Sequence, residues 1–449
     1  MRIFLKMKSF LTHIFIISSV LILLSCGEDR TWEYEEKTQH NHWALEQMRD
    51  KYLWGDSLAD FNPTWKNFFS QPSEFMGIMT AKSRHSDSWS YVEIDTISQD
   101  KHQRGYFSHV NSYGFDFTMM TDPTGQTTRS VLRVLTVYPG SPADRAGLLR
   151  NDYICAYNGY RIASNNLSRL QTGGARQLEV RHISVNEEDG SYVWKDTVEV
   201  EIEASEYVED KAFPVSTIYN VAGSKKVGYL MCNRLLEYPV EKNDRSTSLT
   251  VYQDQLEQMM QQMKDAAVDE MVLDLRLCNY GTLNMAQRLA SHVVTPAALH
   301  STFAKTYWNE RYKGNNLSVP YNLSLPNLGL SRIYILTSPY TQGAAEWLIH
   351  SLQCSMGEEN VILIGTATKG QNVMTQEIGH QHHVRLFPAV AYVADGEGNY
   401  DYNSISPSIE VDEYAYLYLG EYGTNREILL SIAIDNIIGN GQNDTNLGE

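Results

Sequence analysis

Short apolar runs alternate with amphipathic segments through the C-terminal half of the chain. Runs rich in aliphatic and β-branched residues predict buried strands at 225–232, 270–275, 332–337 and 360–365. Segments with apolar residues at helical spacing predict helices at 248–267, 282–294 and 344–352. The first of these helices carries Met259, Met260 and Met263, which we expect in the core. This alternation predicts an α/β domain with parallel strands over 206–440, followed by a tail over 441–449.

The N-terminal pattern is different, because one apolar run follows a basic start. Arg2, Lys6 and Lys8 precede apolar residues 10–24, and the segment ends in "LLSC" at Cys26. The run is shorter than the roughly 20 residues that span a bilayer, so we predict a secretory signal over 1–26. The ending resembles a bacterial lipobox. That resemblance implies lipidation of Cys26 and a lipid-anchored protein of the cell envelope, at the outer membrane, its periplasmic face or the cell surface. A plain cleaved signal or a membrane anchor is the alternative.

Between the signal and the middle of the chain, the pattern is helical and rich in tryptophan. Leu45, Met48 and Tyr52 recur at helical spacing, and prolines interrupt the following residues. We predict a helical cap over 27–105. Its tryptophans, Trp43, Trp54 and Trp65, are expected to pack in the core, and a binding role is the alternative.

Residues 106–205 show short strands and turn residues. Pro142 is placed to begin a short helix and Gly147 to end it, while Asn158-Gly159 predicts a hairpin turn and Asn151 a left-handed residue. Together with "GSPA" at 140–143, these residues resemble a PDZ domain of the bacterial protease type. The resemblance implies a loop that binds a C-terminal carboxylate while the peptide adds as a strand. The matching residues are Tyr113, Gly114, Phe115 and Phe117. A PDZ domain that serves only as a spacer is the alternative.

Composition narrows the possible partners. The 449 residues are 42% apolar, which is enough for two or three domains with cores. A net charge of -17 and the lack of a basic stripe disfavour nucleic-acid binding and favour neutral or basic partners. Beyond Cys26, the cysteines are widely spaced in apolar contexts, so we expect buried thiols, with one disulfide left open. They are Cys155, Cys232, Cys278 and Cys354.

The C-terminal half carries four landmarks in order: "VGYL" at 227–230, "VLDLR" at 272–276, "YILTSPYTQGAAEWLIHSL" at 334–352 and "LIGTATKG" at 363–370. These motifs resemble the tail-specific, or C-terminal processing, serine peptidases. The resemblance covers nearly all of the mature chain. It implies a multidomain α/β protein: an N-terminal helical cap, a β-rich PDZ domain, and a crotonase-like (ClpP/crotonase) α/β peptidase-type domain. It also implies partners that are unfolded or C-terminal polypeptide segments, and no cofactor.

The positions that carry the family's chemistry are substituted here. The nucleophilic serine falls at Ala345, and a methyl group cannot form an acyl-enzyme. The basic lysine falls at Gln371, whose amide has no useful proton affinity near neutral pH. In the loop that helps form the oxyanion hole, Asn279 and Tyr280 precede Gly281, and a tyrosine at a glycine position resists positive φ.

Neighbouring side chains offer little replacement. Lys369 is one residue from the base position, and in an extended segment it points to the opposite face. Ser338 and Thr341 precede the bend and are expected to bond local backbone groups. The three histidines in "GHQHHVRL" could form a metal site, although a solvated strand end is the stronger interpretation. They are His380, His382 and His383. His85 and Asp87 form an ordinary polar loop.

The sequence therefore predicts an exported lipoprotein of the processing-peptidase family that lacks peptidase activity and binds or scaffolds peptides or C-termini. The alternative is an active serine-type endopeptidase with relocated catalytic residues, which would cleave unstructured or C-terminal segments.

Overall fold

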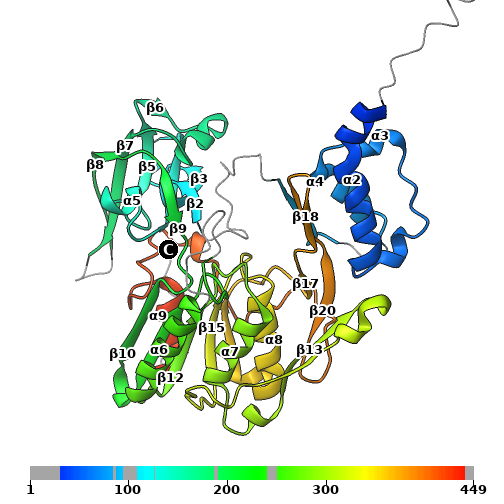
Figure 1. Cartoon of the computed structure of the whole chain (residues 1–449). Coiled ribbons are helices and arrows are strands. Elements are labelled where there is room, and N and C mark those ends of the chain that lie inside the picture. Colours follow the sequence, from blue (N-terminus) through cyan, green and yellow to red (C-terminus); the bar gives the residue numbers. More distant parts are fainter. Residues whose placement is uncertain are drawn as a thin grey trace, which may run out of the picture. The chain divides into compact units, whose positions relative to one another are not determined.

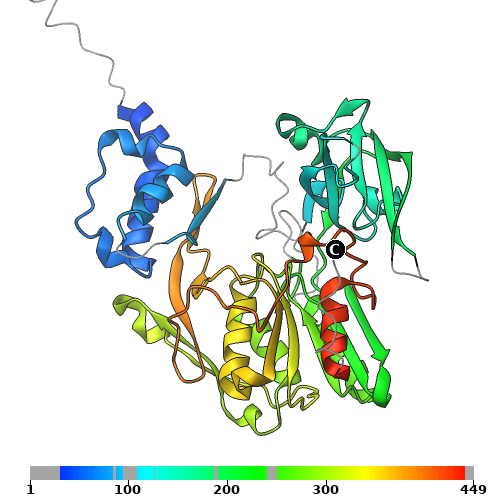
Figure 2. The same cartoon turned by 180° about the vertical axis from the view of Figure 1, so that it is seen from behind.

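The computed structural model describes residues 31–83, 87–94, 109–125, 127–186, 191–239 and 250–439. The predicted signal with Cys26, His85 and the predicted tail over 441–449 lie outside these residues. The chain forms two compact units (Figures 1 and 2). The first contains the described residues up to 94 together with 376–388, and the second contains the remaining described residues.

The N-terminal unit is built on a long helix, α2 (Thr31–Lys51), with shorter helices and a small sheet. The shorter helices are the 3-10 turn Gly55–Leu58, α3 (Trp65–Phe68) and α4 (Pro72–Thr80). Strand β1 (Tyr91–Ile94) pairs antiparallel with β19 (Val384–Phe387), which pairs antiparallel with β18 (Gly379–Gln381). Residues 376–388 thus leave the sequence range predicted for the peptidase-type domain and complete the N-terminal unit.

The tryptophans in this unit differ in how far their side chains are buried. The ring of Trp43 lies against the β18–β19 hairpin, where a Cβ on Gly379 would come within 2.9 Å of it. Trp54 is half-buried and meets Tyr52 edge-on, with 5.3 Å between ring centroids. Trp65 is 63% exposed, so the prediction that it packs in the core is wrong. The four-residue helix α3 holds Trp65 next to Phe69 rather than over the interior of the unit.

The PDZ domain was predicted over 106–205, and the structure forms a β-rich region from β2 to β9, residues 109–209. Its main sheet has the strand order β3-β4-β5-β7-β8, and β6 pairs with β5. The main strands are β3 (Phe115–Thr121), β4 (Ser130–Val137), β5 (Tyr153–Tyr157), β6 (Tyr160–Arg161), β7 (Arg176–Val185) and β8 (Tyr192–Ile202). A separate pair joins β2 (His109–Ser112) to β9 (Glu206–Glu209). The helices are α5 (Pro142–Arg145) and the 3-10 helix Ser164–Leu170.

The turn chemistry predicted for this region is confirmed. Pro142 begins α5, and Ser141 Oγ accepts the Asp144 N–H at 3.2 Å as its N-cap. The residues expected in the left-handed region have positive φ: Asn151 (74°), Asn158 (46°), Gly159 (73°) and Gly147 (77°). These features depend on short-range sterics, which explains why the sequence reveals them.

The remaining residues form an α/β domain around a six-stranded sheet of order β10-β11-β12-β15-β16-β21. All neighbours are parallel except β10 and β11, which are antiparallel. The strands are β10 (Val215–Asn220), β11 (Lys226–Met231), β12 (Glu270–Asp274), β15 (Ile333–Thr337), β16 (Val361–Gly365) and β21 (Ile409–Glu410). A second sheet has the order β14-β13-β20-β17. Its strands are β13 (Thr302–Trp308), β14 (Ser318–Pro320), β17 (Val373–Thr375) and β20 (Ala389–Asp395).

Helices cover both faces of the six-stranded sheet. Alternate strand residues such as Leu273 and Ile335 form one core with α6 (Val251–Asp265), α7 (Leu283–Val293) and α8 (Ala344–Met356). The residues between them, such as Val272 and Leu336, form a second core with α9 (Ile428–Ile438). Figures 1 and 2 show the same two-sided arrangement. The α/β fold with parallel strands is therefore confirmed, and Met260 and Met263 lie in its core as predicted.

Cys232 and Cys278 are buried, Cys155 and Cys354 are half-buried, and these four thiols form no disulfide with one another.

Across residues 31–439, outside the gaps named above, no helix has the length and apolar character needed to cross a bilayer.

Candidate functional site

The candidate site begins at the segment 338–343, called the elbow below, which joins β15 to α8. Gly343 precedes the helix with φ 60° and ψ -115°, a conformation that glycine adopts without steric cost. Ser338 Oγ donates to the Arg276 carbonyl at 2.6 Å, and Thr341 Oγ1 donates to the Leu275 carbonyl at 2.9 Å. Both hydroxyls are buried and tie the elbow to the end of β12. The prediction that they bond backbone groups is confirmed.

Glu346 links the elbow to the loop after β16. Its carboxylate accepts hydrogen bonds from the N–H groups of Gly343, Gly370 and Gln371 and from the Thr368 hydroxyl. The side chain is fully buried. Burial raises the pKa of Glu346, while these hydrogen bonds oppose the rise. This one carboxylate therefore holds the elbow and the loop at 368–371 together.

Ala345 lies on the first turn of α8, where its methyl group is fully buried in the core. Gln371 lies in the loop after β16 and is 7% exposed. The Gln371 side-chain oxygen accepts from Gln342 Nε2 at 2.8 Å, and its Nε2 donates to the Val373 carbonyl at 2.9 Å. A lysine could not make the first of these contacts, because an ammonium group has no acceptor. Gln371 is thus integrated into the loop as a neutral amide.

The loop that follows β12 runs through Cys278, Asn279, Tyr280 and Gly281. Gln342 N–H donates to the Cys278 carbonyl at 2.9 Å, and Leu235 N–H donates to the Tyr280 carbonyl at 3.0 Å. Tyr280 does not have positive φ, and its side chain packs against the core. Gly281 allows close contact instead, because a Cβ there would lie 2.5 Å from Leu235 Cβ and 2.9 Å from Ala344 Cβ. The position in this loop that has no room for a side chain is therefore Gly281, one residue after Tyr280.

Lys369 is exposed, as predicted from its one-residue offset. Its N–H donates to the Thr341 carbonyl at 3.0 Å, which anchors the backbone while the side chain stays in solvent.

The three histidines belong to the N-terminal unit. His380 is on β18, and His382 and His383 form the hairpin turn to β19 with φ of 53° and 63°. Among the described residues, no three His, Cys, Asp or Glu side chains are placed to hold a metal ion. The three histidines thus lie at the end of a strand and in the turn that follows it.

A buried ionic cluster beneath the elbow was not predicted from the sequence. Arg276 donates to Asp274 Oδ2 at 2.6 Å, to Glu413 at 2.7 Å and to Glu427 at 2.6 Å. Arg150 donates to the same Glu413 oxygen at 2.6 Å. Burial disfavours ionised Asp274, but the Arg276 charge and hydrogen bonds hold the pKa of Asp274 below its ordinary value. The cluster connects the PDZ-type region to the end of β12.

The residues predicted to bind a carboxylate surround the start of β3. The Tyr113 and Phe115 side chains are buried in the core of this region, at 1% and 3% exposure. Tyr113 N–H donates to the Gln171 carbonyl at 3.3 Å, and Gly114 N–H donates to Ser112 Oγ at 2.7 Å. A Cβ on Gly114 would lie 2.0 Å from Ser141 Cβ. Two of the amides expected to receive a carboxylate therefore have internal acceptors here.

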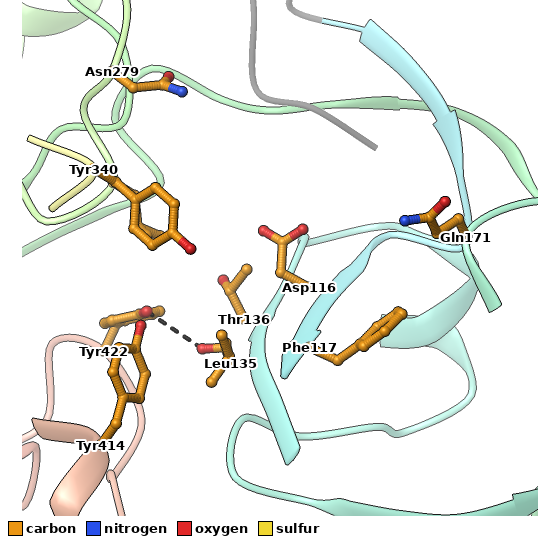
Figure 3. A pocket seen from close by; sticks show the side chains of 10 residues that line it. Asp116, Phe117, Leu135, Thr136, Gln171, Asn279, Tyr340, Tyr414 and Tyr422 are labelled. Atoms are coloured by element: carbon orange, nitrogen blue, oxygen red, sulfur yellow. Dashed lines mark hydrogen bonds between the residues drawn. The ribbon is translucent and has the colours of Figure 1, made fainter. Parts of the chain in front are cut away.

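Beside the elbow, a cavity of about 430 Å³ opens between β3–β4 and the α/β domain (Figure 3). The Asp116 carboxylate and the Tyr340 hydroxyl point toward its centre, and the Asn279 and Gln171 amides flank it. Its lining residues are Asp116, Phe117, Leu135, Thr136, Gln171, Leu277, Asn279, Tyr340, Tyr414 and Tyr422. Only Asn279 and Phe117 were singled out from the sequence. Tyr340 lies inside the motif at 334–352 but was given no role.

Two family models match this chain. Peptidase family S41 matches residues 226–411, and a PDZ domain matches residues 133–171. The comparison with curated proteins finds no match.

Solved structures give a similar result. The chain resembles a candidate S41 protease from Bacteroides fragilis NCTC 9343 with a TM-score of 0.76 and 29% identity, over 88% of this chain and 97% of that one. The photosystem II D1 C-terminal processing protease matches with a TM-score of 0.47 and 16% identity, over 84% and 93% of the two chains.

Proposed function

Because this chain belongs to peptidase family S41, we propose that it is a peptide-binding or scaffolding protein that has lost peptidase activity. Its partners are unfolded or C-terminal polypeptide segments, which is the class of partner that the family suggests. The observation that carries the proposal is the pair Ala345 and Gln371, at the positions of the family's nucleophile and base.

The surroundings of this pair support a permanent loss of chemistry. Removing a nucleophile or a base costs serine peptidases roughly 10⁴ to 10⁶ in rate. Here both groups are absent, and Gln371 accepts a hydrogen bond from Gln342 Nε2 that a lysine, which has no acceptor, could not accept. The nearest hydroxyls named in the sequence, Ser338 and Thr341, donate to backbone carbonyls. No activated replacement therefore stands at the elbow.

The frame around the pair supports retained binding. Glu346 still joins the elbow to the loop at 368–371, and Gly281 still allows the loop after β12 to approach α8. A cavity lies next to this frame, between the PDZ domain and the peptidase-type domain. A cleft shaped for an extended peptide can hold one without cleaving it, because binding and bond cleavage use different groups.

The experiment uses the intact protein with a serine-directed fluorophosphonate and with an unstructured test polypeptide. We expect no covalent adduct by mass spectrometry, no cleavage after prolonged incubation, and saturable binding of the polypeptide by fluorescence anisotropy. An adduct, or cleavage that one polar substitution abolishes, would establish the alternative of an active endopeptidase. Absence of both binding and cleavage would contradict the peptide-binding role.

We also propose that the protein is anchored in the cell envelope through a lipid on Cys26. The support is the "LLSC" ending of the N-terminal segment and its basic, then apolar, pattern. Expression in a bacterial host with a radiolabelled fatty acid should label the protein and place it in the membrane fraction. Cys26→Ser should abolish the label, and Cys155→Ser should leave it unchanged. Label that persists in Cys26→Ser would contradict the anchor.

A further inference from the structure

We propose that an aromatic surface on the N-terminal unit lies in the interface of the lipid bilayer that holds the anchor. This inference rests on the proposed lipid at Cys26 and adds the part of the protein that meets the membrane. The surface, called the aromatic end below, consists of Trp32 and Tyr34 of α2, Trp65 of α3, and Phe69, which follows α3. Trp32, Trp65 and Phe69 are exposed, at 62%, 63% and 42%.

The four rings gather at the N-terminal end of α2. The Tyr34 and Phe69 rings meet with 5.4 Å between their centroids, and the Trp65 and Phe69 rings meet with 6.0 Å. Trp32 is the second residue of α2, two positions before Tyr34. Figure 1 shows α3 beside this end of the helix. Exposed apolar side chains that gather in one place, unlike those that are scattered singly, mark a site of interaction.

Buried contacts behind the aromatic end hold it in place. Asn41 of α2 is 1% exposed, and its Nδ2 donates to the Phe68 carbonyl at 2.9 Å. The buried Phe68 ring stacks on His42 with 3.7 Å between centroids. Phe68 therefore fixes α3 to α2, while Trp65 and Phe69 stay outside. Because this arrangement exists before a bilayer is met, little ordering is needed when the exposed rings are covered.

The position of the proposed anchor favours a bilayer as the occupant. Cys26 precedes Thr31, the first residue of α2, by five positions. Five residues span at most about 18 Å when fully extended, so a lipid on Cys26 keeps the start of α2 within that distance of the membrane surface. Tryptophan and tyrosine collect at membrane–water interfaces, because each side chain has an apolar body and a polar group. The aromatic end is thus within reach of the bilayer and chemically suited to it.

The size of the aromatic end disfavours a second copy of the chain as its occupant. A fully covered tryptophan or phenylalanine side chain buries roughly 150–250 Å². Three such side chains that are about half exposed offer on the order of 300 Å², whereas a stable protein interface takes about 800 Å² from each partner. Contact with a bilayer needs no such minimum area here, because the lipid anchor already holds the protein at the membrane.

Charge at this end favours zwitterionic headgroups. The two segments that form it, 31–42 and 64–70, contain three glutamates and two lysines. One of the glutamates, Glu33, lies in the first turn of α2, where the positive end of the helix dipole stabilises a carboxylate. These segments therefore lack the cluster of basic residues that draws proteins to anionic lipids. Contact with the bilayer depends on the rings rather than on electrostatic attraction.

The test uses the intact lipidated protein in vesicles of phosphatidylcholine, either plain or brominated near the headgroup end of the acyl chains. Bromine quenches tryptophan fluorescence on contact, so it reports which rings enter the bilayer. Two of the eight tryptophans belong to the aromatic end, so with equal emission from each we expect a loss of about a quarter of the fluorescence. Adding phosphatidylglycerol should not increase the quenching.

Tryptophan substitutions identify the rings that are quenched. Trp32→Phe combined with Trp65→Phe keeps two apolar rings but removes both reporters, so it should abolish most of the quenching. Trp54→Phe combined with Trp194→Phe removes two half-buried tryptophans and should keep the quenching.

Phe69→Ser tests the surface itself, because it removes an exposed ring and leaves both tryptophan reporters. It should lower the quenching. Leu317→Ser is the matched control, since it removes an apolar side chain that is 59% exposed on the second unit, and it should leave the quenching unchanged.

The fatty-acid label on Cys26, measured in the same preparation, separates the two proposals. Labelled protein that shows no quenching, or quenching that persists without Trp32 and Trp65, would overturn the membrane contact and leave the anchor standing. Quenching that requires anionic lipid would also overturn the contact. Self-association in detergent that Trp65→Ser abolishes would assign the surface to a second copy instead. If the label is absent, the anchor and this inference fail together.

Discussion

Arg150 of the PDZ domain and Glu413 of the peptidase-type domain form a buried ion pair, with 2.6 Å between Nη2 and Oε2. The pair is separated by 263 positions in the sequence. Arg150 also donates to the Leu135 carbonyl at 3.0 Å and to the Gly420 carbonyl. One guanidinium therefore joins the PDZ sheet, the segment before α9 and, through Glu413, Arg276 at the end of β12.

Arg150→Met should destabilise the protein. Methionine keeps an apolar stem of similar length but leaves Glu413 with Arg276 as its remaining charged partner. Breaking a buried ion pair costs about 3–5 kcal/mol, and we expect about 3 kcal/mol because Arg276 remains. Urea denaturation followed by tryptophan fluorescence measures the change.

Arg145→Met provides the control on the same domain. Arg145 pairs with Glu203 and Glu206, and all three side chains are exposed. Solvent-exposed pairs contribute little, so the unfolding midpoint should stay close to that of the natural protein. Equal losses in the two variants would mean that the buried cluster has no special role in stability.

The sequence reveals the local part of this structure well. Asn151, Asn158 and Gly147 adopt the left-handed backbone conformation that was predicted, because this preference depends on the residue type itself. The alternation of strands and helices follows from apolar periodicity in the same way. Ala345 lies at the start of α8 and Gln371 lies in the loop after β16, where the continuous motifs around them predicted a helix start and a turn.

The parts that the sequence does not reveal depend on residues far apart. The pairing of Tyr91 with Phe387 moves the β18–β19 hairpin into the N-terminal unit, and no local pattern marks that exchange. Asp116 and Tyr340 line one cavity from positions separated by more than half of the described chain. Trp65 was expected in the core because of its residue type, yet the short helix α3 leaves it in solvent.

Gly370→Ala should disrupt the loop after β16 that contains Gln371. Gly370 has φ of 97°, and a Cβ there would lie 1.3 Å from the Asn403 carbonyl oxygen, so the backbone must move. Positive φ and overpacking each cost about 1–3 kcal/mol, so we expect a loss of at least 2 kcal/mol, measured by thermal unfolding.

Gly77→Ala is the matched control, for which we expect a change in stability of the opposite sign. Gly77 lies inside α4, and a Cβ there would have no atom within 4 Å. Alanine favours a helix over glycine by up to about 1 kcal/mol, so this variant should be slightly stabilised. Destabilisation by Gly77→Ala would contradict the open space next to Gly77, because it would mean that the added methyl group meets a neighbouring atom.

His292 should make the protein sensitive to acid. Burial lowers the pKa of His292 from 6.5 to about 4, and its Nδ1 lies 2.6 Å from the Pro326 carbonyl oxygen. Between these two values the unfolded chain binds a proton that the folded chain does not, so stability falls as the pH falls. The pKa difference corresponds to about 3 kcal/mol, lost between pH 6.5 and 4.

His292→Asn removes this titration and keeps a side-chain amide that can donate to the Pro326 carbonyl. Urea unfolding between pH 4.5 and 7.5 should show a smaller loss of stability in acid for this variant than for the natural protein. His300→Asn changes an exposed histidine and should leave the acid sensitivity as it is. Parallel pH profiles for the natural protein and His292→Asn would contradict the assignment.

Restoring the family residues, Ala345→Ser together with Gln371→Lys, should not restore peptidase activity. Lysine loses the hydrogen bond accepted from Gln342 and places an ammonium group at a position that is 7% exposed. An unpaired buried donor costs about 1–3 kcal/mol, so Gln371→Lys alone should also lower the unfolding midpoint. The new serine would lie where the Ala345 methyl is fully enclosed by the core.

Under the proposed assignment, the loop after β12 adds a third obstacle, because Tyr280 stands where the motif predicts a glycine and packs against that core. We therefore expect no fluorophosphonate adduct with the double variant after prolonged incubation, measured by intact-protein mass spectrometry. A triple variant with Tyr280→Gly tests whether this loop is the remaining barrier. An adduct in the double variant would mean instead that the elbow is still competent and that two side chains alone account for the lost chemistry.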